Sequence, residues 1–512
     1  MPGTLLVLFS APYWATRSLY DDELYSLGLA RLPSLARVWQ AAVTNDVHPP
    51  LHYVYAWLWL RAPLPVEWAA KASGLFACLV ALALVERTLR SIGWSVRRSL
   101  LASSIAAVHP NLMLWGSAFR WYPLWSCLNV ALCAAALAWW RKPNLRSSSL
   151  LVLCAALASL TNYASLITGF ALLLVGGFWL PRCSADERLW RLRSLALVSV
   201  ALLALLALYW PCLHVHLQNI GTQVEHTSRT KALAYALFAI LLGQSVWPWQ
   251  WAWTGVGALG LCLALLRVQR TWRSERALFS VAGAALCAVS LFAFALATTK
   301  ARNLLGYSMC AGVVCGALLE RPRDWLWLAP LLGFWLYADV NVLRRQSLHK
   351  AGLQDPIALV SEEVVRTAQA PDTLIALTNN VIGYYVSQRL GSTRMCTVYD
   401  LAAQGGPASG CPKDLGHFSK VLFIDSYLGS LMAKAQEHAE LERVLASHAV
   451  ESELGHYGYD ADFEQKNRWF PGAGLRPWRH RLVMFSLPTP MAEQPEVRSA
   501  LEHFFNEPLW GQ

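Results

Sequence analysis

The chain has 512 residues, of which 55% are hydrophobic and 15% are charged, and its formal net charge is +11. Soluble domains contain about 45–50% apolar and about 25% charged residues, so this composition excludes a disordered chain, a collagen-like repeat and a disulfide scaffold. It indicates a membrane protein with a soluble portion, in which the 25 Trp and 17 Tyr suit the water–lipid boundary. We attribute the positive charge to basic loops that orient membrane helices, and we expect no nucleic-acid partner.

Apolar stretches along the chain predict eleven membrane crossings. In chain order they lie at about 1–14, 66–86, 99–116, 122–140, 148–161, 164–180, 194–211, 247–266, 277–297, 303–319 and 325–339. The first stretch has no basic residues before it, so we do not expect a cleaved signal peptide. Two further apolar stretches are too short to cross. We expect 51–61 to be a helix in the interface and 232–243 to be half-embedded.

The charges of the linkers predict the orientation of these crossings. Five linkers are rich in Arg and Lys, namely 87–98, 141–146, 182–193, 267–276 and 321–323. The positive-inside rule assigns these linkers to the cytoplasm. The N-terminus is then inside, and the loops between the basic linkers face outward together with everything after Asp339.

Residues 340–512 have the pattern of an external α/β domain. Strand-length apolar runs at Thr373–Thr378, Val421–Ile424 and Leu482–Phe485 alternate with helix-like stretches such as 427–447. The glycine cluster at 405–410 lacks a phosphate-loop or dinucleotide motif and is interpreted as a mobile loop. Cys396 and Cys411 fall in this part, where the oxidising side of the membrane permits a disulfide between them.

The first outer loop, residues 15–50, carries the most informative polar residues. It contains Asp21-Asp22-Glu23 and, later, Asp46-Val47-His48-Pro49-Pro50. One of the adjacent carboxylates could act as a general base, but acids also commonly begin helices, and His48 before two prolines could simply form a turn. The spans are nearly free of ionisable residues, with Lys71, His109 and Asp339 toward their outer ends. This pattern argues against an ion-coupled transporter, which needs such groups near the midplane.

These motifs resemble those of the dolichyl-phosphate-mannose–protein mannosyltransferases, glycosyltransferase family 39, whose bacterial relatives include the aminoarabinose transferase of lipid A. The matching residues are Asp22-Glu23 and Asp46-x-His48-Pro49-Pro50-Leu51-x-Tyr53. Weaker matches are Phe119-Arg120-Trp121-Tyr122-Pro123-Leu124, Thr161-Asn162-Tyr163 and Lys300-Ala301-Arg302-Asn303-Leu304-Leu305. Asn162 and Asn303 depart from the family pattern, which commonly has His and Tyr there. The resemblance covers about residues 10–340.

The resemblance implies a GT-C fold and a reaction at the outer face of a bacterial cytoplasmic membrane. Its membrane glycosyltransferase domain would cover 1–339 and its soluble periplasmic domain 340–512. The donor would be a polyprenyl-phosphate-linked sugar, and the acceptor a hydroxyl of a protein or a glycolipid. Such a transfer would invert the anomeric centre and requires no cofactor. Membrane lipids are the remaining partners.

The same resemblance assigns roles to individual residues. Asp22, with Glu23 beside it, would be the catalytic carboxylate that takes the acceptor proton. Cations would bind the donor phosphate as its negative charge grows, and the candidates are Arg302, Arg120, Lys300 and Lys71. Substrate-positioning residues would be Asp46, His48, Tyr122 and Asn162. Each cation could instead extend to lipid head groups.

Other interpretations of the polar and aromatic residues stay open. Asp46 and His48 could bind a divalent ion, but two ligands do not make a metal site, and we predict none. His214, His216 and His226 fall in the predicted outer loop 212–231, where acceptor contact or solvation is favoured over metal binding. The tryptophans of 247–253 are interpreted as an interfacial belt. The alternative functions are a lipid-linked sugar flippase or transporter and a non-catalytic relative.

Overall fold

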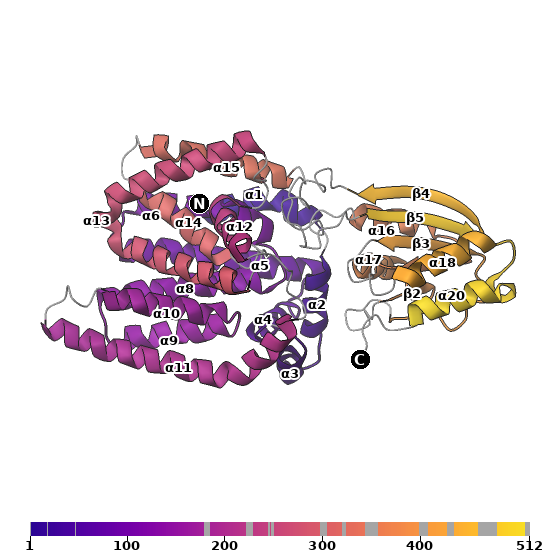
Figure 1. Cartoon of the computed structure of the whole chain (residues 1–512), viewed down its shortest axis with the longest axis horizontal. Helices are drawn as coiled ribbons and strands as arrows, with labels where there is room; N and C mark the ends of the chain where they lie inside the picture. Colours follow the sequence, from indigo (N-terminus) through magenta and orange to yellow (C-terminus); the bar gives the residue numbers. More distant parts are fainter. Residues whose placement is uncertain are drawn as a thin grey trace. The chain divides into compact units, whose positions relative to one another are not determined.

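A computed structural model describes residues 2–17, 19–46, 48–178, 185–221, 229–243, 246, 250–296, 305–319, 324–343, 357–398, 408–426, 435–458 and 479–506. The chain forms two compact units (Figure 1). The helical unit contains residues 1–16 and 32–349, and the α/β unit contains residues 17–31 and 350–512. Part of the predicted first outer loop therefore groups with the C-terminal part of the chain.

The helical unit is built from helices, and all of them except α3, which falls in the predicted first outer loop, overlap predicted apolar stretches. They are α1 (Pro2–Thr16), α3 (Leu35–Asn45), α4 (Leu51–Trp59), α5 (Val66–Ser91), α6 (Val96–Ala107), α7 (Pro110–Trp115), α8 (Trp121–Arg141), α9 (Leu145–Ser159), α10 (Ala164–Phe178), α11 (Ala185–Gly221), α12 (Arg229–Leu242), α13 (Trp251–Leu296), α14 (Leu305–Ala317) and α15 (Trp325–Leu343). Each of the eleven stretches overlaps one of these helices. Within the described residues, five helices are long and apolar enough to span a bilayer, and four more are apolar but shorter. The protein is a multi-pass membrane protein; the number of crossings and their orientation stay predictions.

Three of the predicted helix and loop boundaries are wrong. The stretch 99–116 is two helices, because Pro110 cannot continue α6, and the His109 side chain caps α7 by accepting from the N–H of Asn111. The basic linker 267–276 lies inside α13, which is kinked at Glu275. The predicted outer loop 212–231 is helical up to Gly221, since α11 continues through Pro211.

Ion pairing explains the position of the α13 kink. The carboxylate of Glu275 lies 2.8 Å from Nη1 of Arg98 and accepts a 3.2 Å hydrogen bond from the indole of Trp94. Arg98 also donates to the carbonyl of Ala317, 2.8 Å away. One cluster thus fixes the beginning of α6, the bend of α13 and the end of α14.

Small residues let α6 and α14 pack with their backbones close together. A Cβ added to Gly316 would lie 2.4 Å from the Cα of Ala102, and one added to Gly312 would lie 2.5 Å from the Cα of Ala106. The spacing of four residues places both glycines on one face of α14. This is the packing of small residues that membrane helices use for close approach.

The α/β unit contains a five-stranded mixed sheet. Its elements are α2 (Asp21–Ala30), α16 (Ile357–Thr367), β1 (Thr373–Leu377), α17 (Asn380–Leu390), β2 (Met395–Thr397), β3 (Lys420–Ser426), α18 (Ala435–His448), β4 (Val450–Gly458), β5 (Arg479–Ser486), η7 (Met491–Glu493) and α20 (Pro495–Asn506). The strand order is β2-β1-β3-β5-β4, with β2, β1 and β3 parallel and the pairs β3–β5 and β5–β4 antiparallel. The three predicted strands are present, whereas β2 and β4 had no clear signal. The predicted helix at 427–447 is α18 from residue 435 onward; residues 427–434 lie outside the described residues.

Helices α18 and α20 bury one face of the sheet. Alternate strand residues such as Leu374, Phe423 and Phe485 form a core with Leu445 of α18 and Leu501 of α20. Helix α17 contacts β1 and β2, and α16 packs against α17. The result is an α/β domain, as the sequence predicts.

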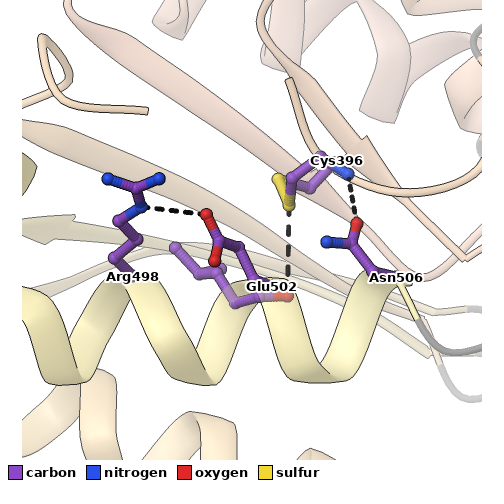
Figure 2. The surroundings of a disulfide bond; sticks show 6 residues. Cys396, Arg498, Glu502 and Asn506 are labelled. Atoms are coloured by element: carbon purple, nitrogen blue, oxygen red, sulfur yellow. Dashed lines mark hydrogen bonds and ion pairs between the residues drawn. A yellow bond between two sulfur atoms is a disulfide. The ribbon is translucent and has the colours of Figure 1, made fainter. Parts of the chain in front are cut away.

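A disulfide between Cys396 and Cys411 joins β2 to the segment before β3 (Figure 2). The N–H of Cys411 donates to Oδ1 of Asn506, 3.0 Å away, which ties the bridge to the end of α20. Gly410 has a φ of +97° and forms an isolated bridge with Thr397. Of the predicted mobile loop at 405–410, residues 405–407 lie outside the described residues.

Candidate active site

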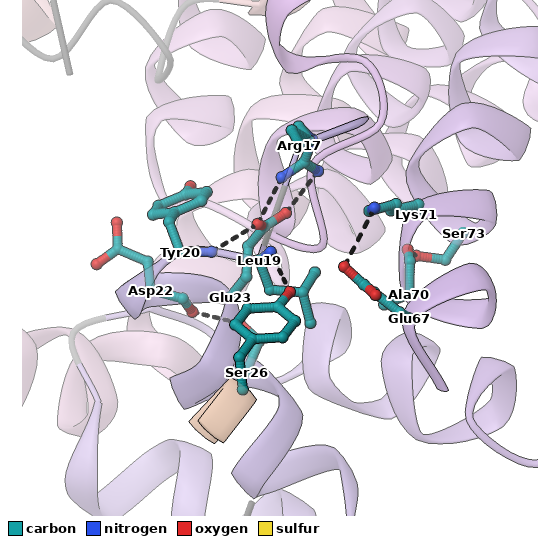
Figure 3. A network of polar contacts seen from close by, with 11 residues as sticks. Arg17, Leu19, Tyr20, Asp22, Glu23, Ser26, Glu67, Ala70, Lys71 and Ser73 are labelled. Atoms are coloured by element: carbon teal, nitrogen blue, oxygen red, sulfur yellow. Dashed lines mark hydrogen bonds and ion pairs between the residues drawn. The ribbon is translucent and has the colours of Figure 1, made fainter. Parts of the chain in front are cut away.

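The Arg17–Glu23 pair orders the beginning of α2 in the α/β unit (Figure 3). Nη1 and Nη2 of Arg17 donate to Oε2 and Oε1 of Glu23 over 2.7 and 2.8 Å. Their side chains are 2% and 0% exposed. The N–H of Tyr20 donates to the same carboxylate over 3.1 Å, within the first turn of the helix. A buried bidentate pair fixes both chain direction and side-chain geometry, so Glu23 holds this segment in place.

Asp22 differs from its neighbour Glu23 in direction and burial. Its side chain is half-buried, and Figure 3 shows its carboxylate pointing away from Arg17. Its carbonyl oxygen accepts a 3.1 Å hydrogen bond from the hydroxyl of Ser26. The N-terminus of a helix favours an ionised carboxylate, because the N–H groups of the first turn point toward it. The two predicted catalytic carboxylates thus have different surroundings.

Helix α17 holds the segment that precedes Asp22. The backbone N–H of Leu19 donates a 2.8 Å hydrogen bond to the hydroxyl of Tyr385. Leu19 is fully buried, and α2 packs against α17. The position of Asp22 therefore depends on contacts made by the C-terminal part of the chain.

A second polar cluster lies in the helical unit and links Asp46, Tyr53 and Arg120. The hydroxyl of Tyr53 donates to the carboxylate of Asp46, and Nη1 of Arg120 lies 3.4 Å from that hydroxyl. Asp46 is the residue after α3, Tyr53 lies in α4 and Arg120 is the residue before α8. The exposed fractions of Asp46 and Arg120 are 7% and 6%. The structure thus joins two motifs that are separate in the sequence.

Aromatic rings adjoin this cluster. The His48 ring lies 5.0 Å from that of Trp121, and the Trp121 ring lies 4.5 Å from that of Tyr122. Trp121 and Tyr122 are buried. His48 and Tyr122, both predicted to position substrate, are therefore joined by the ring of Trp121 next to Arg120.

The remaining predicted cations have separate environments. Lys71 lies in α5 with its Nζ 3.2 Å from Glu67, one turn earlier on the same helix (Figure 3). The Lys71 side chain is buried, whereas that of Glu67 is partly exposed. Lys300 and Arg302 lie outside the described residues.

Asn162 caps a helix, and Tyr163 follows it. Oδ1 of Asn162 accepts a 2.9 Å hydrogen bond from the N–H of Ala164, at the beginning of α10. Burial raises the pKa of Tyr163 well above its usual value, and the carboxylate of Asp46 adds to the effect. The turn between α9 and α10 thus lies close enough to Asp46 to interact with it electrostatically.

His52 is a buried residue that the sequence interpretation overlooked. It precedes Tyr53, is 1% exposed, and packs its ring against Tyr53 and Phe119. Among the described residues, neither ring nitrogen has a hydrogen-bond partner. Burial, and secondarily the charge of Arg120, holds the pKa of His52 well below its usual value. The imidazole is therefore neutral at physiological pH.

Three further residues gained importance only from the structure: Arg17, Tyr53 and Tyr385. Tyr53 stands at the end of the Asp46-x-His-Pro-Pro-Leu-x-Tyr motif, so its place in that motif was an available signal. Arg17 lies six residues before Glu23 and outside α2, so the pair does not have the spacing of three or four residues that indicates an ion pair on a helix. Tyr385 carries no local signal, because its contact with Leu19 spans 366 residues.

Metal binding receives no support from the part of the chain that the structure describes. Within those residues, no three His, Cys, Asp or Glu side chains gather as metal ligands. His214 is exposed on α11 and stacks at 6.2 Å on Trp210. His216 and His226 have no described side chains.

Comparison with known proteins yields a structural likeness. No family model and no curated protein sequence matches the chain. ArnT from Cupriavidus metallidurans in the apo state is similar with a TM-score of 0.55 at 13% identity, over 94% of this chain and 96% of that one. ArnT bound to undecaprenyl phosphate is similar with a TM-score of 0.52 at 12% identity, over the same shares.

These likenesses establish the fold. A match over nearly the full length of both chains includes the helical unit and the α/β unit together. The predicted GT-C-like helical fold with a C-terminal α/β domain is therefore confirmed, as is the predicted resemblance to an aminoarabinose transferase at the level of fold.

Proposed function

We propose that this protein is a membrane glycosyltransferase that uses a polyprenyl-phosphate-linked sugar. It transfers the monosaccharide to an acceptor hydroxyl, on a protein or a glycolipid, with inversion of the anomeric centre. The ArnT fold supports the proposal, and one ArnT structure contains undecaprenyl phosphate. We further propose that the protein resides in a bacterial cytoplasmic membrane with its α/β unit in the periplasm.

One observation carries the proposal more than any other. The motif ending in Tyr53 and the motif containing Arg120 meet through a hydrogen bond between residues 67 positions apart. Both motifs resemble those of one glycosyltransferase family. A buried carboxylate, phenol and guanidinium in one cluster is costly to desolvate, and functional sites are enriched in such clusters.

In the proposed reaction, Asp22 is the general base. Its carboxylate takes the proton of the acceptor hydroxyl as the hydroxyl oxygen attacks the anomeric carbon. The new bond joins that oxygen to the anomeric carbon, and the bond from the same carbon to the lipid phosphate oxygen breaks. The electron pair of the broken bond leaves with the polyprenyl phosphate. We assign Glu23 to holding the segment, because its carboxylate is engaged by Arg17 and by the N–H of Tyr20.

The leaving phosphate needs fixed positive charge. We assign this role first to Arg120, then to Lys71, Arg302 and Lys300. A buried guanidinium stabilises developing phosphate charge better than an exposed one, because little water screens it. Asp46 and Tyr53 would orient Arg120, while His48, Tyr122 and Asn162 would shape the surroundings of the sugar. We propose this displacement without a cofactor, and we assign no residue to a metal ion.

The test uses membranes from cells that express the protein or its Asp22→Asn variant. A panel of radiolabelled polyprenyl-phosphate sugars is supplied, and loss of label from the lipid is followed. Transfer from one donor that disappears in the variant would support the proposal and identify the sugar, and the labelled product would identify the acceptor. If intact donors instead cross the bilayer equally with either protein, the proposal fails and the protein is a flippase.

A further inference from the structure

The helical unit contains an apolar groove with a buried acid at one end. The groove has a volume of about 600 Å³ and lies between α1, α6 and α15. Its walls are Leu5 and Phe9 of α1, Leu101 and Ile105 of α6, and Leu332 and Trp335 of α15. A volume of this size is within the usual range of small-molecule sites.

The groove is long enough for a lipid chain. It extends from Arg97 to Val108 along α6 and from Trp325 to Asp339 along α15. At about 1.5 Å per residue these segments measure about 16 and 21 Å, or more than half of the about 30 Å hydrocarbon core. Trp325 and Leu336 in its wall are exposed, so the groove is open to the side on which lipid would lie.

Asp339 is the unusual residue of this groove. It is 2% exposed, and within the described part of the chain its Oδ1 has no hydrogen-bond partner. Of the other polar wall groups, the Trp335 indole is engaged, because it donates to the carbonyl of Leu241 over 2.9 Å and packs on His109. Ser104 contributes a hydroxyl to the same wall. Burying a carboxyl oxygen without a hydrogen bond is expensive, so this oxygen calls for a donor from outside the described side chains.

We propose that this groove binds a membrane phospholipid whose head group carries a primary amine. One lipid chain lies along the apolar wall, and the ammonium group donates hydrogen bonds to Asp339. The charges of the groove fit this orientation of the lipid, because Arg97, at the end opposite to Asp339, repels a cation. They disfavour a lipid with an anionic head group at Asp339, including a polyprenyl phosphate. The site is therefore distinct from the cation-rich donor site proposed above.

Native mass spectrometry of the full-length, delipidated protein tests the proposal. The probes are phosphatidylethanolamine, phosphatidylcholine and phosphatidylglycerol with identical acyl chains. Phosphatidylcholine keeps the positive charge without N–H donors, and phosphatidylglycerol has hydroxyl donors with a negative charge. We expect phosphatidylethanolamine to bind about tenfold more tightly than either, which corresponds to about 1.4 kcal/mol. Equal binding of the three lipids would overturn the proposal.

Three variants assign the preference to the groove. Asp339→Asn keeps the side-chain shape and removes the charge, so it should lower the preference to below about twofold. Leu332→Trp fills the groove and should reduce binding of all three lipids. Asp372→Asn, in the α/β unit, controls for a general effect of losing one negative charge. A preference that persists in Asp339→Asn would place the amine elsewhere and refute the site. If a variant fails to fold, the relative affinities of the wild type for the three lipids still test the proposal.

Discussion

The hydroxyl of Tyr385 accepts a 2.8 Å hydrogen bond from the backbone N–H of Leu19, a residue 366 positions earlier in the chain. Three residues separate Leu19 from the buried Glu23, and Asp22 lies between them. The segment is thus held at two points, by Tyr385 and by the Arg17–Glu23 pair. This arrangement makes α17 part of the support of the proposed catalytic base.

Loss of the Tyr385 hydroxyl should affect turnover more than donor binding. A neutral hydrogen bond contributes about 1 kcal/mol, so Tyr385→Phe should lower kcat about fivefold and leave KM for the donor nearly unchanged. Tyr384→Phe, on the same helix, is the matched control. Hydrogen exchange of residues 17–31 should accelerate in Tyr385→Phe alone. If hydrogen exchange is faster but kcat is unchanged, the hydrogen bond between Tyr385 and Leu19 stabilises the segment without contributing to catalysis.

The two adjacent carboxylates should respond differently to amidation. Asp22→Asn should lower the rate of sugar transfer by about 10²–10⁴, the usual contribution of a general base, with little change in Tm. Glu23→Gln leaves Arg17 buried without its charge partner and should destabilise the protein by about 3–5 kcal/mol. Rate and Tm measured on both variants check the assignment. If the Glu23→Gln protein is stable but no longer transfers sugar, then Glu23 is the general base and Asp22 has the structural role.

Arg120 should matter mainly for the transition state. Arg120→Ala should reduce kcat by about 10²–10³, as for other fixed donors that stabilise a leaving anion. Tyr53→Phe removes only the hydroxyl between Asp46 and Arg120 and should have a smaller effect. Transfer rates at saturating donor compare the two. Equal losses in both variants would indicate that the cluster acts through Tyr53.

His52 should make folding stability depend on pH. Its pKa in the folded protein is well below the ordinary 6.5, so below pH 6.5 the unfolded chain binds a proton that the folded protein does not. Stability from this residue is present above pH 6.5 and falls by about 1.4 kcal/mol per pH unit below it. Thermal unfolding from pH 7.5 to 5 should show a shallower loss in His52→Phe than in the wild type. Parallel curves would assign the acid sensitivity to other groups.

The disulfide should stabilise the α/β unit. Cys396 and Cys411 are 15 residues apart, and closing a loop of this length contributes about 3 kcal/mol. The Cys396→Ser variant should therefore have a lower Tm than the wild type. A reducing agent should lower the Tm of the wild type by a similar amount. The reducing agent should have no further effect on the variant. A Tm that is insensitive to both would show that packing against α20 holds the segment without the bridge.

Apolar length and periodicity were sufficient to predict most of the helices and three of the strands. They failed where a single side chain sets the geometry. The kink in α13 depends on Arg98 and Trp94, which bind Glu275 from another part of the chain. The strand β2 has only three residues and β4 is rich in Glu and Gly, so neither shows the alternation that identifies a strand.

The sequence motifs identified the residues of the polar clusters but not the contacts that fix their positions. Asp46, His48, Arg120 and Tyr122 were selected from two motifs, and the structure groups them through Tyr53 and Trp121. The pairing of Glu23 with Arg17 and of Leu19 with Tyr385 depends on tertiary folding. Residues 17–31 follow the first apolar stretch directly, so nothing local indicates that they pack with residues beyond 350.

The contact between Leu19 and Tyr385 also sets an order of events during synthesis. At about 5–20 residues per second, a ribosome needs on the order of 20–70 s to add the 366 residues that separate them. Throughout this time the segment that bears Asp22 exists without α17. A chain released before α17 would carry the proposed base but lack the helix that holds it, so we expect activity only in chains that extend past Leu390.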